Sequence, residues 1–225
     1  MMKYKEEFIE LMVEANVLRF GDFTAKSGRK TPYFINTGNY KFGAHISKLG
    51  EFYADCYHEF LKDDVNLLFG PAYKGIPLVV SASVALSNKY KVNAPICFNR
   101  KEAKDHGEGG IFVGKAPESG DNIVIIEDVI TAGTAIRESM DIFKNVPGVN
   151  VTDLIIAVDR KEKGKKGNKS TLQELEEEFG IKVHPIVTID DILEYLYNKE
   201  INGKVYIDDT MKARIEKYLS EYGAV

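Results

Sequence analysis

Two adjacent acids and the short loop that follows them form the segment with the clearest chemistry. Glu127 and Asp128 close the apolar run Ile123 to Ile126, and Thr131-Ala132-Gly133-Thr134-Ala135 comes next. Backbone N–H groups and hydroxyls of such a loop can wrap a phosphate, and the N-terminus of a following helix adds partial positive charge. Gly133 lets the backbone approach closely. We predict a sugar-phosphate site in which the two carboxylates accept hydrogen bonds from vicinal hydroxyls. Plain helix capping is the simpler alternative.

A second segment gathers cationic side chains among glycines. Arg100, Lys101, Lys104 and His106 stand within the segment Asn99 to Gly110. This segment has no apolar periodicity, so we expect a mobile loop. Cations that close over a leaving diphosphate would stabilise its charge and exclude water from the reaction. A solvated charged hairpin is the alternative without chemistry.

Two further segments place basic residues beside the expected ends of strands. The run Phe69 to Pro77 is a strand that ends in a tight turn bearing Lys74, whose ammonium could hold a diphosphate and its Mg²⁺. The stretch Phe20 to Ile35 joins a basic turn to an aromatic strand. Chemistry alone assigns no ligand to this second stretch.

Taken together, these segments resemble the type I phosphoribosyltransferases. Ile123 to Ala135 is similar to the family's signature for PRPP (5-phosphoribosyl diphosphate), with Glu127 where Asp is common. Within the family, Asn99 to Gly110 resembles the catalytic loop of orotate phosphoribosyltransferases, and Phe20 to Ile35 resembles their hood over the base.

The resemblance implies a role for each matched residue. Catalytic roles fall to Lys101, Lys104, His106 and Asp128. Orotate would be bound by Lys26, Phe34, Ile35, Thr131 and Arg160; the arginine could hold the carboxylate through two parallel hydrogen bonds. PRPP would be bound by Lys26, Tyr73, Lys74, Arg100, Lys101, Lys104, His106, Glu127, Asp128, Val129, Ile130, Thr131, Ala132, Gly133, Thr134 and Ala135.

The implied reaction transfers ribose 5-phosphate from PRPP to orotate, giving orotidine 5'-phosphate and diphosphate. The resemblance implies Mg²⁺ carried by PRPP without direct protein ligands, and a homodimer whose catalytic loop reaches the partner's site. By that resemblance Arg100 would serve one site, and Lys101, Lys104 and His106 the neighbouring one. A purine phosphoribosyltransferase and a PRPP-sensing regulator of the same fold remain as alternatives.

Composition narrows the class of protein. The chain has 225 residues, 44% of them hydrophobic, and a net charge of −4, so we expect neither a nucleic-acid nor a membrane partner. Cys56 and Cys97 form no disulfide framework and are expected to be buried, which favours a reducing compartment. The charged N-terminus does not read as a signal peptide, and we expect a cytoplasmic enzyme.

The elements that must position these residues indicate an α/β fold, because fully apolar strands alternate with helices. We expect a parallel-sheet core flanked by helices, with an N-terminal hood. The expected parts are residues 1–62 (helices and hood), 63–197 (PRPP-binding core) and 198–225 (helical tail packed on the same domain). Expected strands are Pro32 to Ile35, Val65 to Phe69, Ala94 to Phe98, Ile123 to Ile126, Leu154 to Val158 and Val183 to Thr188. Expected helices are an opening one that stops near Gly21, then Ala44 to Leu61, Ile76 to Leu86, Thr134 to Phe143 and Thr171 to Phe179, and a mostly helical end with a break near Asn202-Gly203.

Overall fold

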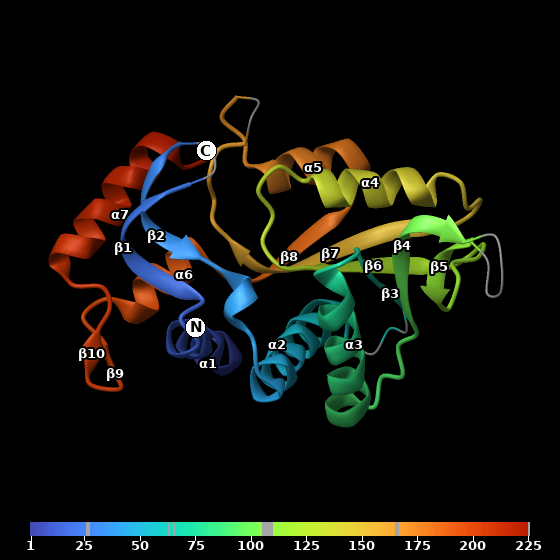
Figure 1. The fold of residues 1–225 in the computed structure, drawn as a ribbon, viewed down its shortest axis with the longest axis horizontal. Helices are drawn as coiled ribbons and strands as arrows, with labels where there is room; N and C mark the ends of the chain where they lie inside the picture. Colours follow the sequence, from blue (N-terminus) through green and yellow to red (C-terminus); the bar gives the residue numbers. More distant parts are fainter. Residues whose placement is uncertain (26–27, 63, 65, 105–109, 165–166, 225) are drawn as a thin grey trace.

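A central sheet organises the molecule. The computed structural model describes residues 1–25, 28–62, 64, 66–104, 110–164 and 167–224. Within these residues a sheet of six strands has the order β5-β4-β3-β6-β7-β8 (Figure 1). Its strands are β3 (Leu67–Gly70), β4 (Ile96–Lys104), β5 (Gly110–Gly114), β6 (Asn122–Glu127), β7 (Asn150–Asp159) and β8 (Lys182–Thr188). All pair in parallel except β5, which runs antiparallel to β4. The expected parallel core is confirmed, with an antiparallel edge strand that the sequence did not predict.

Helices cover both faces of this sheet (Figure 1). Because successive strand residues point to opposite faces, Val124 and Ile126 join one core, whereas Ile123 and Ile125 join the other. Such double burial requires apolar strands. One face carries α1 (Lys3–Glu14), α2 (Gly43–Leu61) and α3 (Gly75–Ala85), which continues as the π-helical turn Leu86–Tyr90; the other carries α4 (Thr134–Phe143) and α5 (Thr171–Phe179).

An antiparallel hairpin stands beside the sheet, between the core and the last helix (Figure 1). Its strands are β1 (Leu18–Thr24) and β2 (Lys30–Ile35), and α7 (Asp209–Tyr222) packs against β2. Tyr33 of β2 is fully buried and meets Tyr218 of α7 edge to face, with 5.9 Å between ring centroids. This hairpin is the expected N-terminal hood, and a short 3-10 turn, Thr37–Asn39, follows it.

The segment between β8 and α7 contains the expected break. The helix α6 (Ile189–Leu196) is followed by β9 (Glu200–Ile201) and β10 (Lys204–Val205), which pair as a hairpin. Asn202 and Gly203 connect them with φ angles of 52° and 79°, the positive values that a two-residue hairpin turn requires. The division of the chain at residues 62 and 197 stays a prediction.

The expected end of the first helix was wrong. This helix ends at Glu14, not near Gly21, and Leu18–Thr24 is a strand. Asn16 has a φ of 54°, a left-handed conformation that commonly ends helices. The apolar residues after it pair with β2 instead of continuing a helical face.

The expected loop from Asn99 to Gly110 was also partly wrong. Residues as far as Lys104 continue β4 and pair with β5, while residues 105–109 lie outside the described residues. The pairing of β4 with β3 ends at Phe98, so the charged residues after it lie on an extension of the sheet formed with β5, where Lys101 and Glu102 are exposed. The absence of an apolar pattern therefore did not exclude a strand.

Two smaller expectations concern the cysteines and a membrane partner. Cys56 and Cys97 are both buried and free, as the sequence predicted. Among the described residues, none of the helices has the length and apolar character needed to cross a membrane.

Candidate active site

The residues singled out from the sequence gather at one edge of the sheet. β3, β6 and β7 are parallel, so the segments that follow them emerge at the same edge. The turn after β3 and the loop after β6 face each other across a cavity of about 320 Å³. It is lined by Pro71, Ala72, Tyr73, Lys74, Glu127, Asp128, Val129, Ile130, Thr131, Ala132, Gly133, Thr134, Ala135 and Ile136. The structure thus brings together the two segments that we assigned to a phosphorylated sugar.

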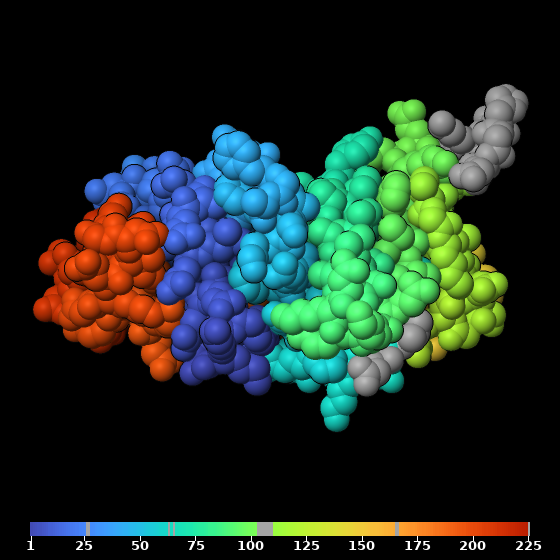
Figure 2. Space-filling model, turned by 90° about the horizontal axis from the view of Figure 1, so that it is seen from below, coloured from blue at the N-terminus to red at the C-terminus, as the bar shows by residue number. Residues whose placement is uncertain are grey.

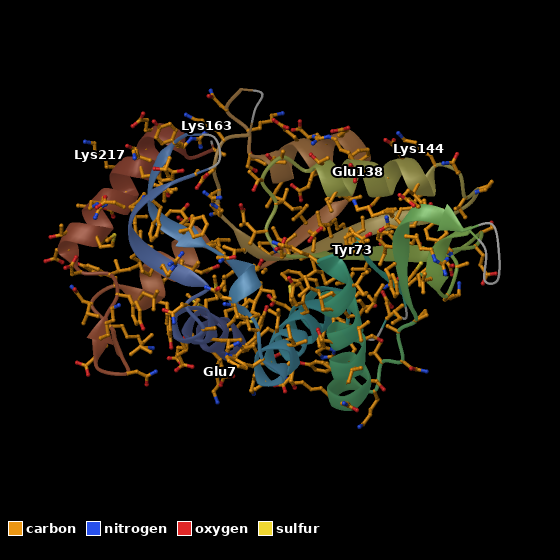
Figure 3. The ribbon with its side chains drawn as sticks, viewed as in Figure 1. Glu7, Tyr73, Glu138, Lys144, Lys163 and Lys217 are labelled. Atoms are coloured by element: carbon orange, nitrogen blue, oxygen red, sulfur yellow. The ribbon has the colours of Figure 1, made fainter. Side chains whose placement is uncertain are left out.

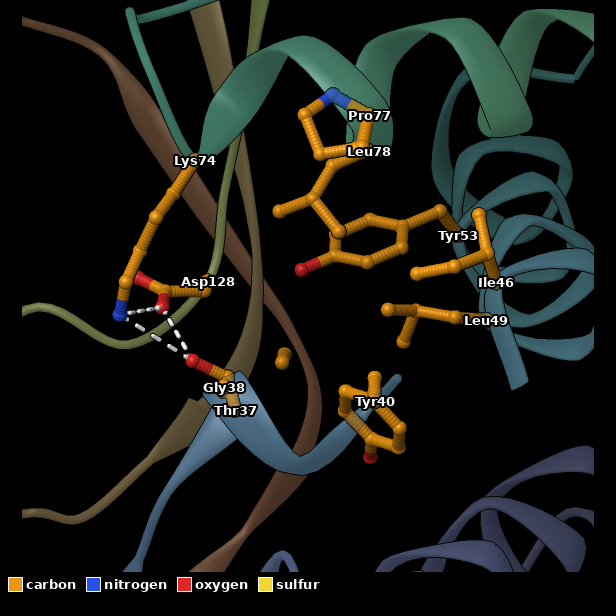
Figure 4. A pocket seen from close by; sticks show the side chains of 11 residues that line it. Thr37, Gly38, Tyr40, Ile46, Leu49, Tyr53, Lys74, Pro77, Leu78 and Asp128 are labelled. Atoms are coloured by element: carbon orange, nitrogen blue, oxygen red, sulfur yellow. Dashed lines mark hydrogen bonds and ion pairs between the residues drawn. The ribbon is translucent and has the colours of Figure 1, made fainter. Parts of the chain in front are cut away.

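Two side chains from other segments meet Asp128 (Figure 4). The Lys74 ammonium donates to Asp128 Oδ2 at 2.9 Å, and the Thr37 hydroxyl donates to the same oxygen at 2.6 Å. Lys74 Nζ also donates to Thr37 Oγ1 at 3.3 Å. Burial opposes ionisation of Asp128, but these hydrogen bonds hold its pKa below the usual value. Asp128 is therefore an ionised acceptor at the centre of the site.

Glu127 has a different environment from its neighbour. Its side chain is buried, and Oε1 accepts the backbone N–H of Asp128 at 2.9 Å. The Tyr53 hydroxyl fixes the backbone from the α2 side by donating to the Glu127 carbonyl at 2.6 Å. Burial, together with the nearby Asp128 charge, raises the pKa of Glu127 to about 7. The pair thus combines one carboxylate that stays charged with one that titrates near neutral pH.

The loop after β6 is shaped for an anion. Gly133 has a φ of 70° and precedes α4, whose N-terminus has no side-chain cap. The first residues of α4, Thr134 to Ile136, line the cavity, so the N–H groups of this helix end are available as donors beside it. Two residues hold the loop from outside: Thr171 donates to the Thr131 carbonyl at 2.9 Å, and Arg137 donates to the Ala132 carbonyl at 2.8 Å. Neither anchor was predicted from the sequence, because neither belongs to a local pattern around the loop.

A second cavity, of about 480 Å³, lies under the hood. Phe34, Ile35, Thr131 and Arg160, four of the five residues to which the resemblance assigned orotate, line it together with Arg29, Lys74 and Asp128. Phe34 stacks on Phe23 of the partner strand, with 5.6 Å between centroids. The two cavities share the wall formed by Lys74 and residues 128–131, so a ligand lying across this wall would reach both.

Arg160 is one of the cations that line the hood cavity. It is mostly buried, its Nη2 donates to Glu162 at 2.5 Å, and its guanidinium lies 5.7 Å from the centroid of the Tyr33 ring. Burial opposes the charge, yet Glu162 and Tyr33 keep the pKa of Arg160 above its usual value. The guanidinium is thus charged and fixed.

Arg100 and Lys101, in the hairpin formed by β4 and β5, lie beside these cavities. Arg100 donates to the carbonyls of Gly110 and Phe112, both at 3.1 Å, and the Lys101 ammonium is 3.7 Å from Glu138 of α4. Arg100 and Lys101 line a separate cavity that also includes Pro71 and Ala72. The structure therefore does not bring these two cations into the cavity around Asp128.

Of the remaining residues assigned to the site, Tyr73 is fully described, whereas Lys26, Lys104 and His106 are not. Tyr73, just before α3 (Figure 3), is 71% exposed although it borders the phosphate cavity. Lys26 and His106 lie outside the described residues, as does the side chain of Lys104, whose backbone ends β4. Thr37 was missed from the sequence, because a single threonine in a 3-10 turn carries no signal.

Known proteins resemble this chain closely. Residues 40–185 match the family model described as phosphoribosyl transferase domain. An orotate phosphoribosyltransferase from Clostridium acetobutylicum is 58% identical over 223 residues, which cover 99% of each chain. One from Clostridium botulinum is 55% identical over 224 residues, covering all of both chains. The solved structure of an orotate phosphoribosyltransferase from Francisella tularensis matches with a TM-score of 0.83 and 36% identity, over 97% of this chain and 100% of that one.

Proposed function

The chain belongs to the orotate phosphoribosyltransferases, and we propose how its own residues divide the work of that reaction. The enzyme transfers ribose 5-phosphate from PRPP to orotate in pyrimidine synthesis. The bond from ribose C1 to the diphosphate oxygen breaks, and the diphosphate leaves with the bonding electrons. A bond from C1 to the orotate ring nitrogen forms, and the proton of that ring N–H is released.

The wall shared by the two cavities carries our assignment of the substrates. Lys74 and Asp128 border both the phosphate cavity and the hood cavity. A ribose placed at Asp128 would have its 5-phosphate against the loop 131–135 and its C1 directed to the hood. This placement assigns the hydroxyls of ribose to Asp128 and Glu127, and the 5-phosphate to the N–H groups before α4.

The two carboxylates also suit the electronic demand of the reaction. Positive charge develops on the ribose as the diphosphate departs, and an ionised carboxylate fixed nearby stabilises that charge. The Lys74 ammonium, 2.9 Å from Asp128 Oδ2, neutralises the charge of this carboxylate. In our proposal Lys74 turns to the diphosphate of PRPP, which leaves Asp128 free for the ribose.

Orotate is assigned to the hood cavity. Arg160 offers a buried guanidinium, and Phe34 and Ile35 present backbone groups of β2 beside it. The carboxylate of orotate would bind Arg160, and the ring edge would bind the backbone of β2. Thr131 would contribute from the loop after β6, and Lys26 from the turn between β1 and β2.

Mg²⁺ is proposed to enter with PRPP. Within the described residues, no group of three or more His, Cys, Asp or Glu side chains is placed to hold a metal. The best-placed carboxylate, Asp128, already accepts hydrogen bonds from Lys74 and Thr37. The donor set therefore fits an ion held mainly by diphosphate and ribose oxygens, where it would offset charge on the leaving group.

We further propose a homodimer in which the β4–β5 hairpin serves the neighbouring site. Val80 and Val84 of α3 are 39% and 56% exposed, and Tyr73 precedes the same helix. Figure 2 shows α3, in green, on the outer surface of the face seen from below. Apolar exposure of this kind is typical of a surface covered by a second subunit. Lys101, Lys104 and His106 would then act across the interface, while Arg100 would serve the site of its own subunit.

We also propose a cytoplasmic location, supported by the two free cysteines.

The loss of orotate absorbance in the presence of PRPP and Mg²⁺ tests these assignments. Wild-type protein should consume orotate, a Lys104→Ala variant should do so much more slowly, and the exposed α5 variant Glu177→Gln should match wild type. Tight binding of PRPP in a calorimeter without consumption of orotate would contradict the assignment of the base.

A further inference from the structure

Glu162 holds together three parts of the hood cavity. Its side chain is 14% exposed and lies two residues beyond Arg160. Oε1 accepts hydrogen bonds from Arg160 Nη2 at 2.5 Å and from the Tyr33 hydroxyl at 2.8 Å. Oε2 is 3.6 Å from Arg29 Nη1. One carboxylate thus joins the end of β7 to both the turn and the second strand of the hood.

The segment after α7 keeps Glu162 in this position. Residues 222–224 pair with residues 161–163 through an antiparallel bridge between Glu162 and Gly223 and through backbone hydrogen bonds of 2.7 and 2.8 Å. The Arg29 guanidinium lies over the Tyr222 ring, 4.5 Å from its centroid. The C-terminal segment, which carries no recognisable motif, therefore supports residues 161–163, which line the hood cavity.

The charges of this cluster suit a carboxylate ligand. Arg29, Arg160 and Glu162 all line the hood cavity, and within this cluster two guanidinium charges are offset by one carboxylate, which leaves one positive charge. Arg160 Nε is buried and has no hydrogen-bond partner in the described part of the chain. A buried donor without a partner is costly, and an acceptor that enters the cavity would satisfy it. Glu162 accepts from Nη2 and leaves Nε without an acceptor.

We propose that Glu162, held by residues 222–224, is a positioning residue that sets Arg160 for the carboxylate of orotate and limits the positive charge of the base cavity. The inference rests on the proposed role of Arg160 in binding orotate. Without Glu162 the two guanidinium groups would repel each other, Arg160 would lose its fixed orientation, and the cavity would attract more highly charged anions such as diphosphate.

Steady-state kinetics of Glu162→Gln separate this role from a general loss of structure. We expect the KM for orotate to rise about tenfold, the loss expected for one hydrogen bond between charged groups, while kcat and the KM for PRPP stay near wild type. Inorganic diphosphate should also become a stronger competitor of orotate. Tyr33→Phe, which removes only the hydroxyl donor to Glu162, should shift the orotate KM in the same direction by less. Glu177→Gln, which breaks an exposed ion pair with Lys169, is the matched control.

Two outcomes would overturn the inference, and a third concerns its premise. An unchanged orotate KM in Glu162→Gln, while Arg160→Ala raises it, would remove Glu162 from orotate recognition and leave Arg160 in place. Equal rises in the KM for PRPP and the KM for orotate, with a lower melting temperature, would show that Glu162 contributes only to folding. An unchanged orotate KM in Arg160→Ala itself would instead refute the proposed role of Arg160. If Glu162→Gln does not fold, the Tyr33→Phe variant decides by the same comparison of the two KM values.

Discussion

Lys74 donates a 2.9 Å hydrogen bond to Asp128 although the two residues lie 54 positions apart and follow different strands. Without a ligand the ammonium and the carboxylate satisfy each other, and Thr37 adds a third partner (Figure 4). PRPP carries both a diphosphate for Lys74 and hydroxyls for Asp128. Binding of PRPP is therefore expected to exchange this ion pair for two contacts with the ligand.

Replacing Lys74 should weaken the binding of PRPP more than the binding of orotate. Lys74→Ala removes one charged partner of the diphosphate, and we expect the KM for PRPP to rise about tenfold to a hundredfold, with a much smaller change for orotate. Initial-rate measurements with each substrate varied in turn check this. Lys144→Ala, which alters an exposed lysine of the segment after α4, is the control. A larger effect on orotate than on PRPP would contradict the assignment.

Glu127 should make stability depend on pH in a predictable direction. Burial raises its pKa in the folded protein from 4.5 to about 7, so the folded state binds more protons than the unfolded state between these values. Its contribution to stability is therefore complete below about pH 4.5 and is lost as the pH rises through about 7. Asp128, whose pKa is lowered, titrates below this window.

Urea unfolding of wild type and Glu127→Gln at pH 5 and pH 8 measures that contribution. Wild type should lose about 1–3 kcal/mol relative to the variant on going from pH 5 to pH 8. Parallel stability profiles of the two proteins would show that Glu127 ionises in its ordinary range.

Gly133→Ala should damage the phosphate loop through both strain and collision. A Cβ there would lie 2.9 Å from Arg137 Nη1 and 3.1 Å from Thr171 Cγ2, in a backbone with a φ of 70°. Gly180 has nearly the same conformation, with a φ of 68°, but its Cβ would meet nothing within 4 Å. Gly180→Ala should thus cost about 1 kcal/mol of stability from strain alone.

Comparing the two alanine variants isolates the collision. We expect Gly133→Ala to lose more stability than Gly180→Ala in chemical denaturation, and to lose affinity for PRPP by calorimetry, which Gly180→Ala should retain. Equal stability and equal PRPP affinity in the two variants would show that Arg137 and Thr171 move aside without consequence.

The proposal that the β4–β5 hairpin acts on the neighbouring subunit can be tested by complementation. Lys104→Ala and Asp128→Asn subunits are each expected to be nearly inactive. If Lys104 acts on the neighbouring site, mixed dimers contain one site with both residues intact, and random mixing should restore about a quarter of the wild-type activity. No recovery after subunit exchange, verified by mass spectrometry, would indicate that each hairpin serves its own subunit.

The sequence by itself determined the parts of the site that are continuous in the chain. Glu127, Asp128 and the loop to Ala135 follow a buried strand and precede a helix whose bounds, Thr134–Phe143, agree with the prediction. Lys74 and Arg160 were likewise recognised at the ends of apolar runs. A strand buried on both faces must be apolar throughout, so its end, and the polar residues that follow it, are visible in the sequence.

Only the tertiary structure decided which of these ends are neighbours and what surrounds them. Thr37 contacts Asp128 across 91 positions, and Tyr33 contacts Glu162 across 129. Neither contact leaves a local periodicity, because each depends on where the hood packs against the sheet. The same reason explains β1 and β5, which are strands through pairing with β2 and β4. Charged residues interrupt β1, and the apolar run of β5 is only three residues long, Ile111 to Val113. Local patterns record burial, whereas the site's geometry is set by long-range packing that local patterns do not contain.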